Sequence, residues 1–223
     1  MPKKIPVIIA ISIILIASAL FSQIDLLRNF MPVLQKERFP DEEKLASYDI
    51  QVNLDVEKNI LTGQEQIIYI NEHDELEALY FHLYPNAFRS EAEAPFAKGE
   101  MAQAYPNGFG PGNIDIYSIE VDGEVLHAVP IGGEQSILKV NLNQPLKQNE
   151  SVEVKIDFKI KIPPSHGRFG YGKNTINICN WYPILSVLDA NGWNLSPYYP
   201  IGDPFYSDVA NYHVEISTPT EYT

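Results

Sequence analysis

The chain has 223 residues and a formal net charge of −13 at pH 7, with 29 acidic residues against 16 lysines and arginines. A surface this acidic repels phosphate backbones, which argues against a nucleic-acid partner. Cys179 is the single cysteine, so the chain has no internal disulfide and no zinc site built on paired cysteines. We expect Cys179 to be a small buried residue.

The N-terminal end carries an apolar run over residues 5–21, preceded by Lys3 and Lys4. The run is at the short end of what spans a bilayer as a helix. A cleaved secretory signal fits the basic start and the small residues at 17–19, whereas an uncleaved signal-anchor fits the length and the β-branched content. We favour the anchor and assign residues 1–22 to a transmembrane signal-anchor, with a cleaved signal peptide as the alternative. Lysines before the run predict a single-pass protein of the cell membrane with an extracellular body, or a secreted body if the signal is cleaved.

The next segment, residues 23–45, mixes scattered apolar residues with charges. Pro32 and Pro40 interrupt any long helix there, so we predict a stalk or linker. The folded domain is predicted over residues 46–223.

In this body the apolar residues recur with a period of two, which is typical of half-buried strands. The clearest run is residues 152–162, where valine, isoleucine and phenylalanine alternate with charged residues. Similar alternation marks residues 50–56, 79–83, 138–142 and 212–216. The dipeptide Asp122-Gly123 predicts a hairpin turn.

Several half-buried strands without a long helical period predict an all-β fold, an antiparallel β-sandwich or saddle-like domain. Two stretches rich in proline and glycine, residues 91–112 and 163–177, are predicted to be loops. Asp189 to Gly192 has the spacing of a turn and lacks the later ligands of a calcium loop. His82 should point away from the apolar face of its strand and bond to a neighbouring loop or strand.

Motifs along the body follow one order: strands at 48–54 and 79–88, R-F-G-Y-G at 168–172, N-W-Y-P at 180–183 and G-D-P-F-Y-S-D at 202–208. In this order they resemble the N-terminal β domain of M1-family zinc metallopeptidases, which are aminopeptidase N-like enzymes. The resemblance implies that this domain shapes one side of a peptide-binding cleft. It also implies two partners: a catalytic domain that is missing after residue 223 and the N-terminus of a peptide substrate. The apolar run predicts a third partner, the membrane through residues 5–21.

The family's chemistry depends on zinc held by an H-E-x-x-H helix. None of the five histidines of this chain has that spacing. We therefore expect no catalytic residues, no metal site and no cofactor in this chain, with zinc implied for the missing catalytic domain. The chain would then be inactive alone, either as a fragment or as a natural truncation.

The resemblance also implies substrate-binding residues. A family pattern of the form Q-x-E-P, which holds the substrate's amine, falls on Asn180, Trp181, Tyr182 and Pro183. Tyr182 stands where the acid would be, and a neutral phenol supplies no charge for an ammonium group. An alternative function is a non-catalytic cell-surface module that binds a peptide or a glycan, and the aromatic residues could also simply pack a sheet edge.

Overall fold

The computed structural model describes residues 44–97, 99–199, 202–203 and 205–221. The predicted membrane or signal segment and nearly all of the predicted stalk lie outside these residues. Residues 46–223 form one compact unit. Within the described part of the chain, no helix is both long and apolar enough to cross a bilayer.

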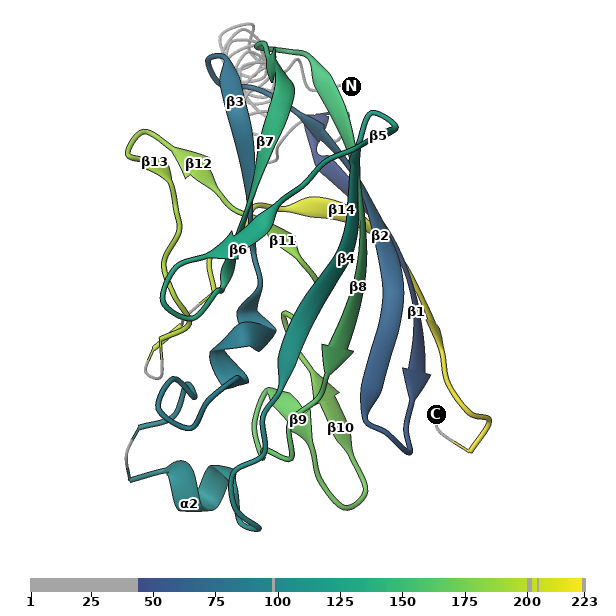
Figure 1. The fold of residues 1–223 in the computed structure, drawn as a ribbon, viewed down its shortest axis with the longest axis vertical. Coiled ribbons are helices and arrows are strands. Elements are labelled where there is room, and N and C mark those ends of the chain that lie inside the picture. Colours follow the sequence, from purple (N-terminus) through teal and green to yellow (C-terminus); the bar gives the residue numbers. More distant parts are fainter. Residues whose placement is uncertain (1–43, 98, 200–201, 204, 222–223) are drawn as a thin grey trace, which may run out of the picture. The chain divides into compact units, whose positions relative to one another are not determined.

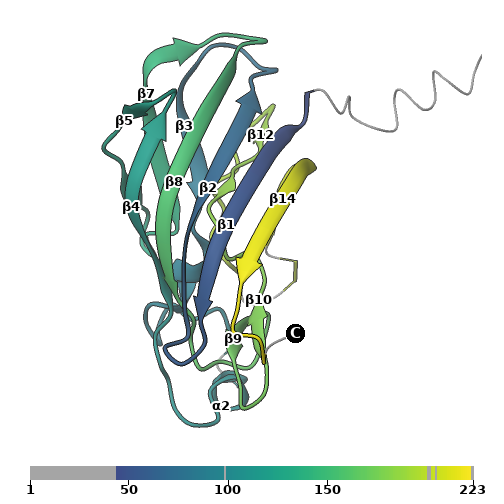
Figure 2. The same cartoon turned by 90° about the vertical axis from the view of Figure 1, so that its right-hand side faces the viewer.

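The larger of two main sheets has six strands and runs along one side of the unit (Figure 1). Its order is β14 (Ala210–Ser217), β1 (Ala46–Asp55), β2 (Ile60–Ile70), β8 (Ser151–Lys161), β4 (Asn113–Val121) and β5 (Glu124–Val125). Strand β14 forms one edge beside β1, as Figure 2 shows.

The second sheet has four strands, in the order β11 (Ile184–Leu185), β3 (Leu76–His82), β7 (Ile137–Leu146) and β6 (Val129–Ile131). Two hairpins accompany the sheets: β9 (Phe169–Tyr171) with β10 (Ile176–Ile178), and β12 (Leu188–Asp189) with β13 (Gly192–Trp193). The helical elements in the described residues are the 3-10 helix η2 (Tyr84–Phe88) and α2 (Met101–Ala104). The predicted loops at 91–112 and 163–177 were therefore wrong in part, because they contain α2 and most of the β9–β10 hairpin.

The core lies between the two sheets. Val154, Ile156 and Phe158 of β8 are fully buried, as the period of two predicted, and they belong to one cluster with Leu79 and Phe81 of β3. Charged residues of β8 alternate with them on the other face. The predicted mostly-β architecture is confirmed.

The prediction of purely antiparallel sheets was wrong at one place, because β14 runs parallel to β1. The alternation of side chains is the same in parallel and antiparallel strands, so the sequence pattern does not reveal strand direction.

A second layer of aromatic residues covers the outer face of the smaller sheet. His82 is 1% exposed and shares a ring stack with Tyr84, with centroids 4.7 Å apart. Its Nε2 lies 3.0 Å from the carbonyl oxygen of Asn194, as expected for a histidine that points away from the core and bonds a neighbouring segment. Since a carbonyl only accepts, Nε2 carries the proton and donates it.

Cys179 is exposed, contrary to the expectation that it is buried. It directly follows β10, which pairs with β9 in a two-stranded sheet outside the two main sheets. A two-stranded β hairpin has no second layer of its own to bury such a side chain.

Both predicted turns are present. In the Asp189 turn, the backbone N–H of Asn191 donates to Asp189 Oδ1 over 2.7 Å, and Gly192 has φ of 100°. In the Asp122-Gly123 turn the two φ angles are 49° and 82°, which is the left-handed region. The second turn links β4 to β5.

Replacing Gly123 with alanine is expected to lower the free energy of unfolding by about 1–2 kcal/mol, because a Cβ is disfavoured in left-handed backbone. Gly133→Ala is the matched control, because Gly133 has no positive φ and a Cβ there would meet no atom within 4 Å. Urea denaturation of both variants tests the expectation. Equal losses in the two variants would show that the turn geometry is not responsible.

Candidate functional site

The residues predicted to bind substrate lie between β10 and β11 and differ in their surroundings. Asn180 is half-exposed with φ of 49°. Trp181 is 7% exposed and belongs to the core, with its ring 6.1 Å from that of Phe158. Tyr182 is half-buried and turns toward the sheet edge formed by β1 and β14. The three side chains therefore do not line one surface, and Tyr182 is the one that reaches the sheet edge.

Tyr182 belongs to a tyrosine cluster, which we define as Tyr48, Tyr182 and Tyr212. The rings of Tyr48 and Tyr212 stack with centroids 4.9 Å apart, and Tyr182 meets both edge-on at 5.7 and 6.0 Å. The Tyr182 hydroxyl donates to the Tyr212 hydroxyl over 3.2 Å, and the Leu185 N–H donates to the Tyr48 hydroxyl over 3.1 Å. Edge-on and offset rings are the favoured arrangements for aromatic pairs.

A buried acid, Glu65, lies on the inner face of the larger sheet close to this cluster. It is fully buried and pairs across strands with Ile50 of β1 and Ile156 of β8, both also fully buried. Both of its carboxyl oxygens lack a hydrogen-bond partner among the described residues. A carboxyl group in such surroundings is costly, because neither its charge nor its oxygens are compensated.

The charge of Glu65 affects the pKa values of two of the tyrosines. Burial raises the pKa of the Glu65 carboxyl well above its ordinary value. Burial, and then the charge of Glu65, raise the pKa of Tyr48. The pKa of Tyr182 is raised first by burial, then by its hydrogen bond to Tyr212, with a further contribution from Glu65. Burial therefore favours the uncharged form of the acid and of the phenols.

An open hollow of about 410 Å³ borders the tyrosine cluster. It is lined by Tyr48 and Tyr212 together with Ser47, Asp49, Gln66, Ile68, Asn211 and His213. Tyr212 is 46% exposed, so one member of the cluster is in contact with solvent. Asp49 and Gln66 alternate along their strands with the buried Tyr48 and Glu65, and Asn211 and His213 lie on the face of β14 opposite to Tyr212. The hollow therefore opens on the outer face of the larger sheet, opposite to Glu65.

The sequence-based predictions missed Glu65, although a signal was present. Leu61, Glu65 and Ile67 occupy the same phase of the two-residue alternation in β2, and all three are fully buried. An acid in the buried phase of a strand is rare enough to mark a candidate site. Its proximity to Tyr182 depends on the tertiary fold and is not visible in the sequence.

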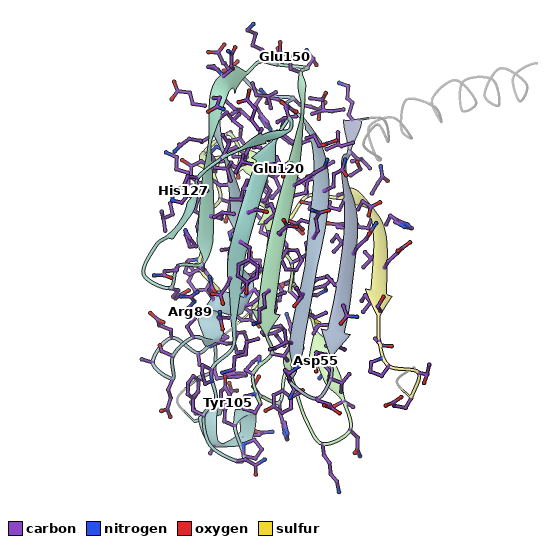
Figure 3. The ribbon with its side chains drawn as sticks, turned by 45° about the vertical axis from the view of Figure 1, so that its right-hand side comes forward. Asp55, Arg89, Tyr105, Glu120, His127 and Glu150 are labelled. Carbon is purple, nitrogen blue, oxygen red and sulfur yellow. The ribbon has the colours of Figure 1, made fainter. Side chains whose placement is uncertain are left out.

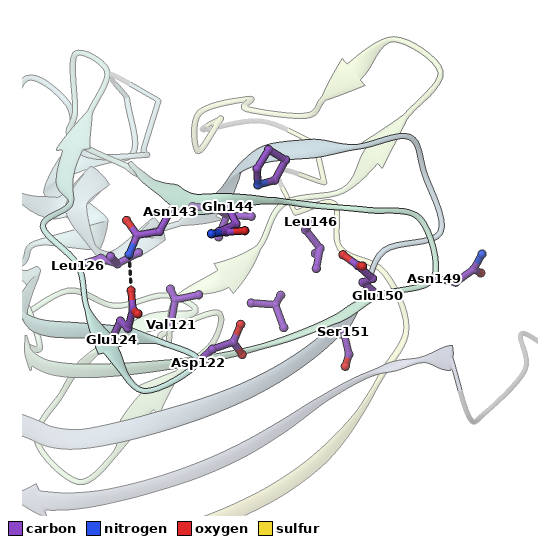
Figure 4. Close-up of a pocket in the computed structure, with 13 residues that line it drawn as sticks. Val121, Asp122, Glu124, Leu126, Asn143, Gln144, Leu146, Asn149, Glu150 and Ser151 are labelled. Carbon is purple, nitrogen blue, oxygen red and sulfur yellow. Dashed lines mark hydrogen bonds between the residues drawn. The ribbon is translucent and has the colours of Figure 1, made fainter.

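A second pocket, of about 540 Å³, lies where the β4–β5 hairpin meets the β7–β8 connection (Figure 4). The carboxylates that line it accept hydrogen bonds from other groups of the protein. Asp122 accepts from the Glu153 N–H, Glu124 from the Asn143 amide, and Glu150 from the Lys147 N–H. Glu150 lies at the opposite end of the larger sheet from Asp55 (Figure 3). These hydrogen bonds indicate that the three acids stabilise turns and hairpins.

Metal ligation has no candidate among the described residues, where no three histidine, cysteine, aspartate or glutamate side chains are grouped to hold an ion. The residues present thus do not fit a zinc ion.

Comparisons with known proteins gave matches among solved structures. No protein-family model matches the chain. No curated protein matches it either.

The solved structures it resembles include a two-domain M1 zinc metallopeptidase mutant bound to L-tryptophan, with 14% identity and a TM-score of 0.41 over 80% of this chain and 34% of that chain. The M1 zinc metallopeptidase from Deinococcus radiodurans aligns with 12% identity and a TM-score of 0.36, over 53% of this chain and 20% of that chain. Native yeast LTA4 hydrolase aligns with 13% identity and a TM-score of 0.32, over 52% of this chain and 14% of that chain. The chain therefore spans about a third or less of the length of these structures.

Proposed function

We propose that residues 46–223 form the peptide-binding β domain of a membrane-associated M1-like zinc metallopeptidase and shape one side of its substrate cleft. The observation that carries the proposal is the buried, unpartnered acid Glu65 near the tyrosine cluster to which Tyr182 belongs. The M1-like motifs put Tyr182 at the position that recognises the amine, where a phenol supplies no charge. A buried carboxyl without a partner lies close enough to raise the pKa of that phenol.

In the proposed binding mode, the protonated amine of a peptide approaches past Tyr212, the half-exposed member of the tyrosine cluster. Parting the Tyr182–Tyr212 hydrogen bond opens the way to Glu65. The carboxyl then loses its proton and accepts charge-assisted hydrogen bonds from the ammonium group, while the tyrosine rings flank the cation.

The hydrolytic chemistry belongs, in this proposal, to a separate catalytic domain that carries the zinc, because the described residues do not fit that ion. The role of this chain is to bind and orient the peptide. We further propose that residues 5–21 hold the protein at the cell membrane with the β domain on the extracellular side.

Glu65→Gln is expected to weaken binding of a short peptide with a free N-terminus at least tenfold, because loss of a charge-assisted hydrogen bond costs about 1.5–3 kcal/mol. Isothermal titration with the 223-residue chain in detergent measures this. The N-acetylated peptide should bind equally weakly to both proteins. In the wild type, affinity should increase as pH rises toward the raised pKa of Glu65, because binding requires the Glu65 proton to leave. The variant should lack this increase.

Glu120→Gln is the matched control, because Glu120 is a half-buried acid on β4, three strands along the sheet from β1 (Figure 3). Its binding constants should equal those of the wild type. If Glu65→Gln binds the free-amine peptide as tightly as the wild type, Glu65 does not recognise the amine. Binding of a neutral oligosaccharide in place of the peptide would favour the glycan-binding alternative.

A further inference from the structure

Among the described residues, one edge of the larger sheet is unpaired, and the peptide-binding role does not use its backbone groups. Strand β14 is the outermost strand at this edge and pairs with β1 on one side (Figure 2). An edge strand presents backbone N–H and C=O groups that another strand can bond. Natural proteins often block such edges with lysine or proline, and β14 has neither.

The side chains of β14 differ sharply between its two faces. Tyr212, Val214 and Ile216 are aligned with the buried Tyr48, Ile50 and Val52 of β1, yet they are 46%, 43% and 44% exposed. The opposite face carries polar side chains, namely Asn211, His213, Glu215 and Ser217. The apolar row of the inner face thus continues onto β14, where it is only half covered.

The sequence of β14 can pair with a second, antiparallel copy of itself when the two copies are centred on Val214, because apolar residues then face apolar residues and His213 faces Glu215. We propose that two copies of this chain associate through antiparallel pairing of their β14 strands, with Val214 on the two-fold axis. In this register Tyr212 lies opposite Ile216 of the second copy, and His213 lies opposite Glu215. Cross-strand pairs of apolar residues and of opposite charge each stabilise a sheet.

Charge and face together select this register over its neighbours. A shift of the axis to Glu215 would place two glutamates opposite each other, which repel. A shift to His213 would place the two histidines opposite each other and lose both His213–Glu215 pairs. An axis between two residues would put the apolar rows of the two copies on opposite faces of the joined sheet. His213 Nε2 and Glu215 Oε1 are 3.3 Å apart along the strand, so pairing would create an alternating group of four polar side chains.

Disulfide cross-linking tests the register. In a Cys179→Ser background, which removes the exposed native thiol, Val214→Cys places two thiols directly opposite each other across the axis. Ile216→Cys is the matched control, since its exposure is 44% against 43% for Val214. Two copies of residue 216 would lie about 13 Å apart along the strands, too far for a disulfide. At least tenfold more cross-linked dimer is expected for Val214→Cys under mild oxidation. Equal cross-linking at both positions would overturn the proposed register.

A charge exchange tests the pairing without a cross-link. In the 223-residue chain in detergent, His213→Glu should raise the dimer dissociation constant about tenfold, because two pairs of like charges then face each other. The double variant His213→Glu/Glu215→Lys restores opposite charges and should return to within about twofold of the wild type. Sedimentation equilibrium measures the constants. A wild-type chain that stays monomeric, or dimers insensitive to both variants, would refute the proposal.

Discussion

Replacing Glu65 with methionine is expected to raise the free energy of unfolding at pH 7 by about 1–3 kcal/mol, the cost of a buried polar group without a partner. Methionine has a similar length and places no polar atom between Ile50 and Ile156, the neighbours of Glu65 on β1 and β8. Both Glu65 oxygens lack partners among the described residues, so the substitution breaks no hydrogen bond seen there. Denaturant titration of the 223-residue chain, with and without the substitution, measures the gain.

The gain in the free energy of unfolding depends on pH, and the burial of Glu65 determines whether it grows or shrinks as pH rises. Because burial raises the pKa of folded Glu65, the folded state holds its proton over a range in which the unfolded chain has lost it. Stability from this group is therefore fully present below the unfolded pKa of about 4.3 and is lost as pH rises toward the folded pKa. Glu65→Gln, which does not titrate, should lack this loss.

Glu120→Gln again serves as the control and should stay within about 0.5 kcal/mol of the wild type at every pH, as surface substitutions usually do. A Glu65→Met variant that is less stable than the wild type at pH 7 would show that the carboxyl has a stabilising partner in the folded protein.

The same acid thus has opposite expected effects on stability and on binding. A residue kept for structure alone should destabilise the protein when it is removed, whereas a group kept for a ligand often carries a stability cost. A Glu65 variant that folds more stably and binds a free-amine peptide more weakly would show both effects in one protein. This combination is difficult to explain by a general loss of structure.

The local elements of this fold were predictable where one face of a strand is buried. Strand β8 follows its alternation because Val154, Ile156 and Phe158 meet the other sheet while the intervening charged residues point outward. The Asp122-Gly123 turn was predictable because few other dipeptides adopt two positive φ angles.

The pairing of strands that lie far apart in the sequence was not predictable in the same way. The parallel pairing of β14 with β1 joins residues more than 150 positions apart, and neither strand's alternation encodes direction. The β9–β10 hairpin was hidden in a glycine-rich stretch because each of its strands has three residues, too few to show a period. The contact between Tyr182 and Tyr212 depends on the place of β14 in the sheet, so the sequence indicated Tyr182 without the cluster around it.

Acidification is expected to destabilise the fold through His82. Burial lowers the pKa of His82 to about 4, with the hydrogen bond to Asn194 partly opposing that shift. Nδ1 is buried without a partner among the described residues, so a proton placed there would create a buried N–H with no acceptor. Since the unfolded chain binds this proton at about pH 6.5, stability is fully present above that pH and is lost as pH falls toward 4. The pKa difference corresponds to about 3 kcal/mol.

His82→Gln isolates this contribution, because a glutamine amide keeps a donor for the Asn194 carbonyl and does not titrate. Between pH 7 and pH 4 the wild type should lose up to about 3 kcal/mol relative to this variant in denaturant titrations. His127→Gln removes an exposed histidine and should stay within about 0.5 kcal/mol of the wild type at pH 7. Parallel pH profiles for wild type and His82→Gln would mean that His82 is protonated in the folded protein as readily as in the unfolded chain. Comparing each variant with the wild type separates His82, which destabilises the fold in acid, from Glu65, which destabilises it as pH rises.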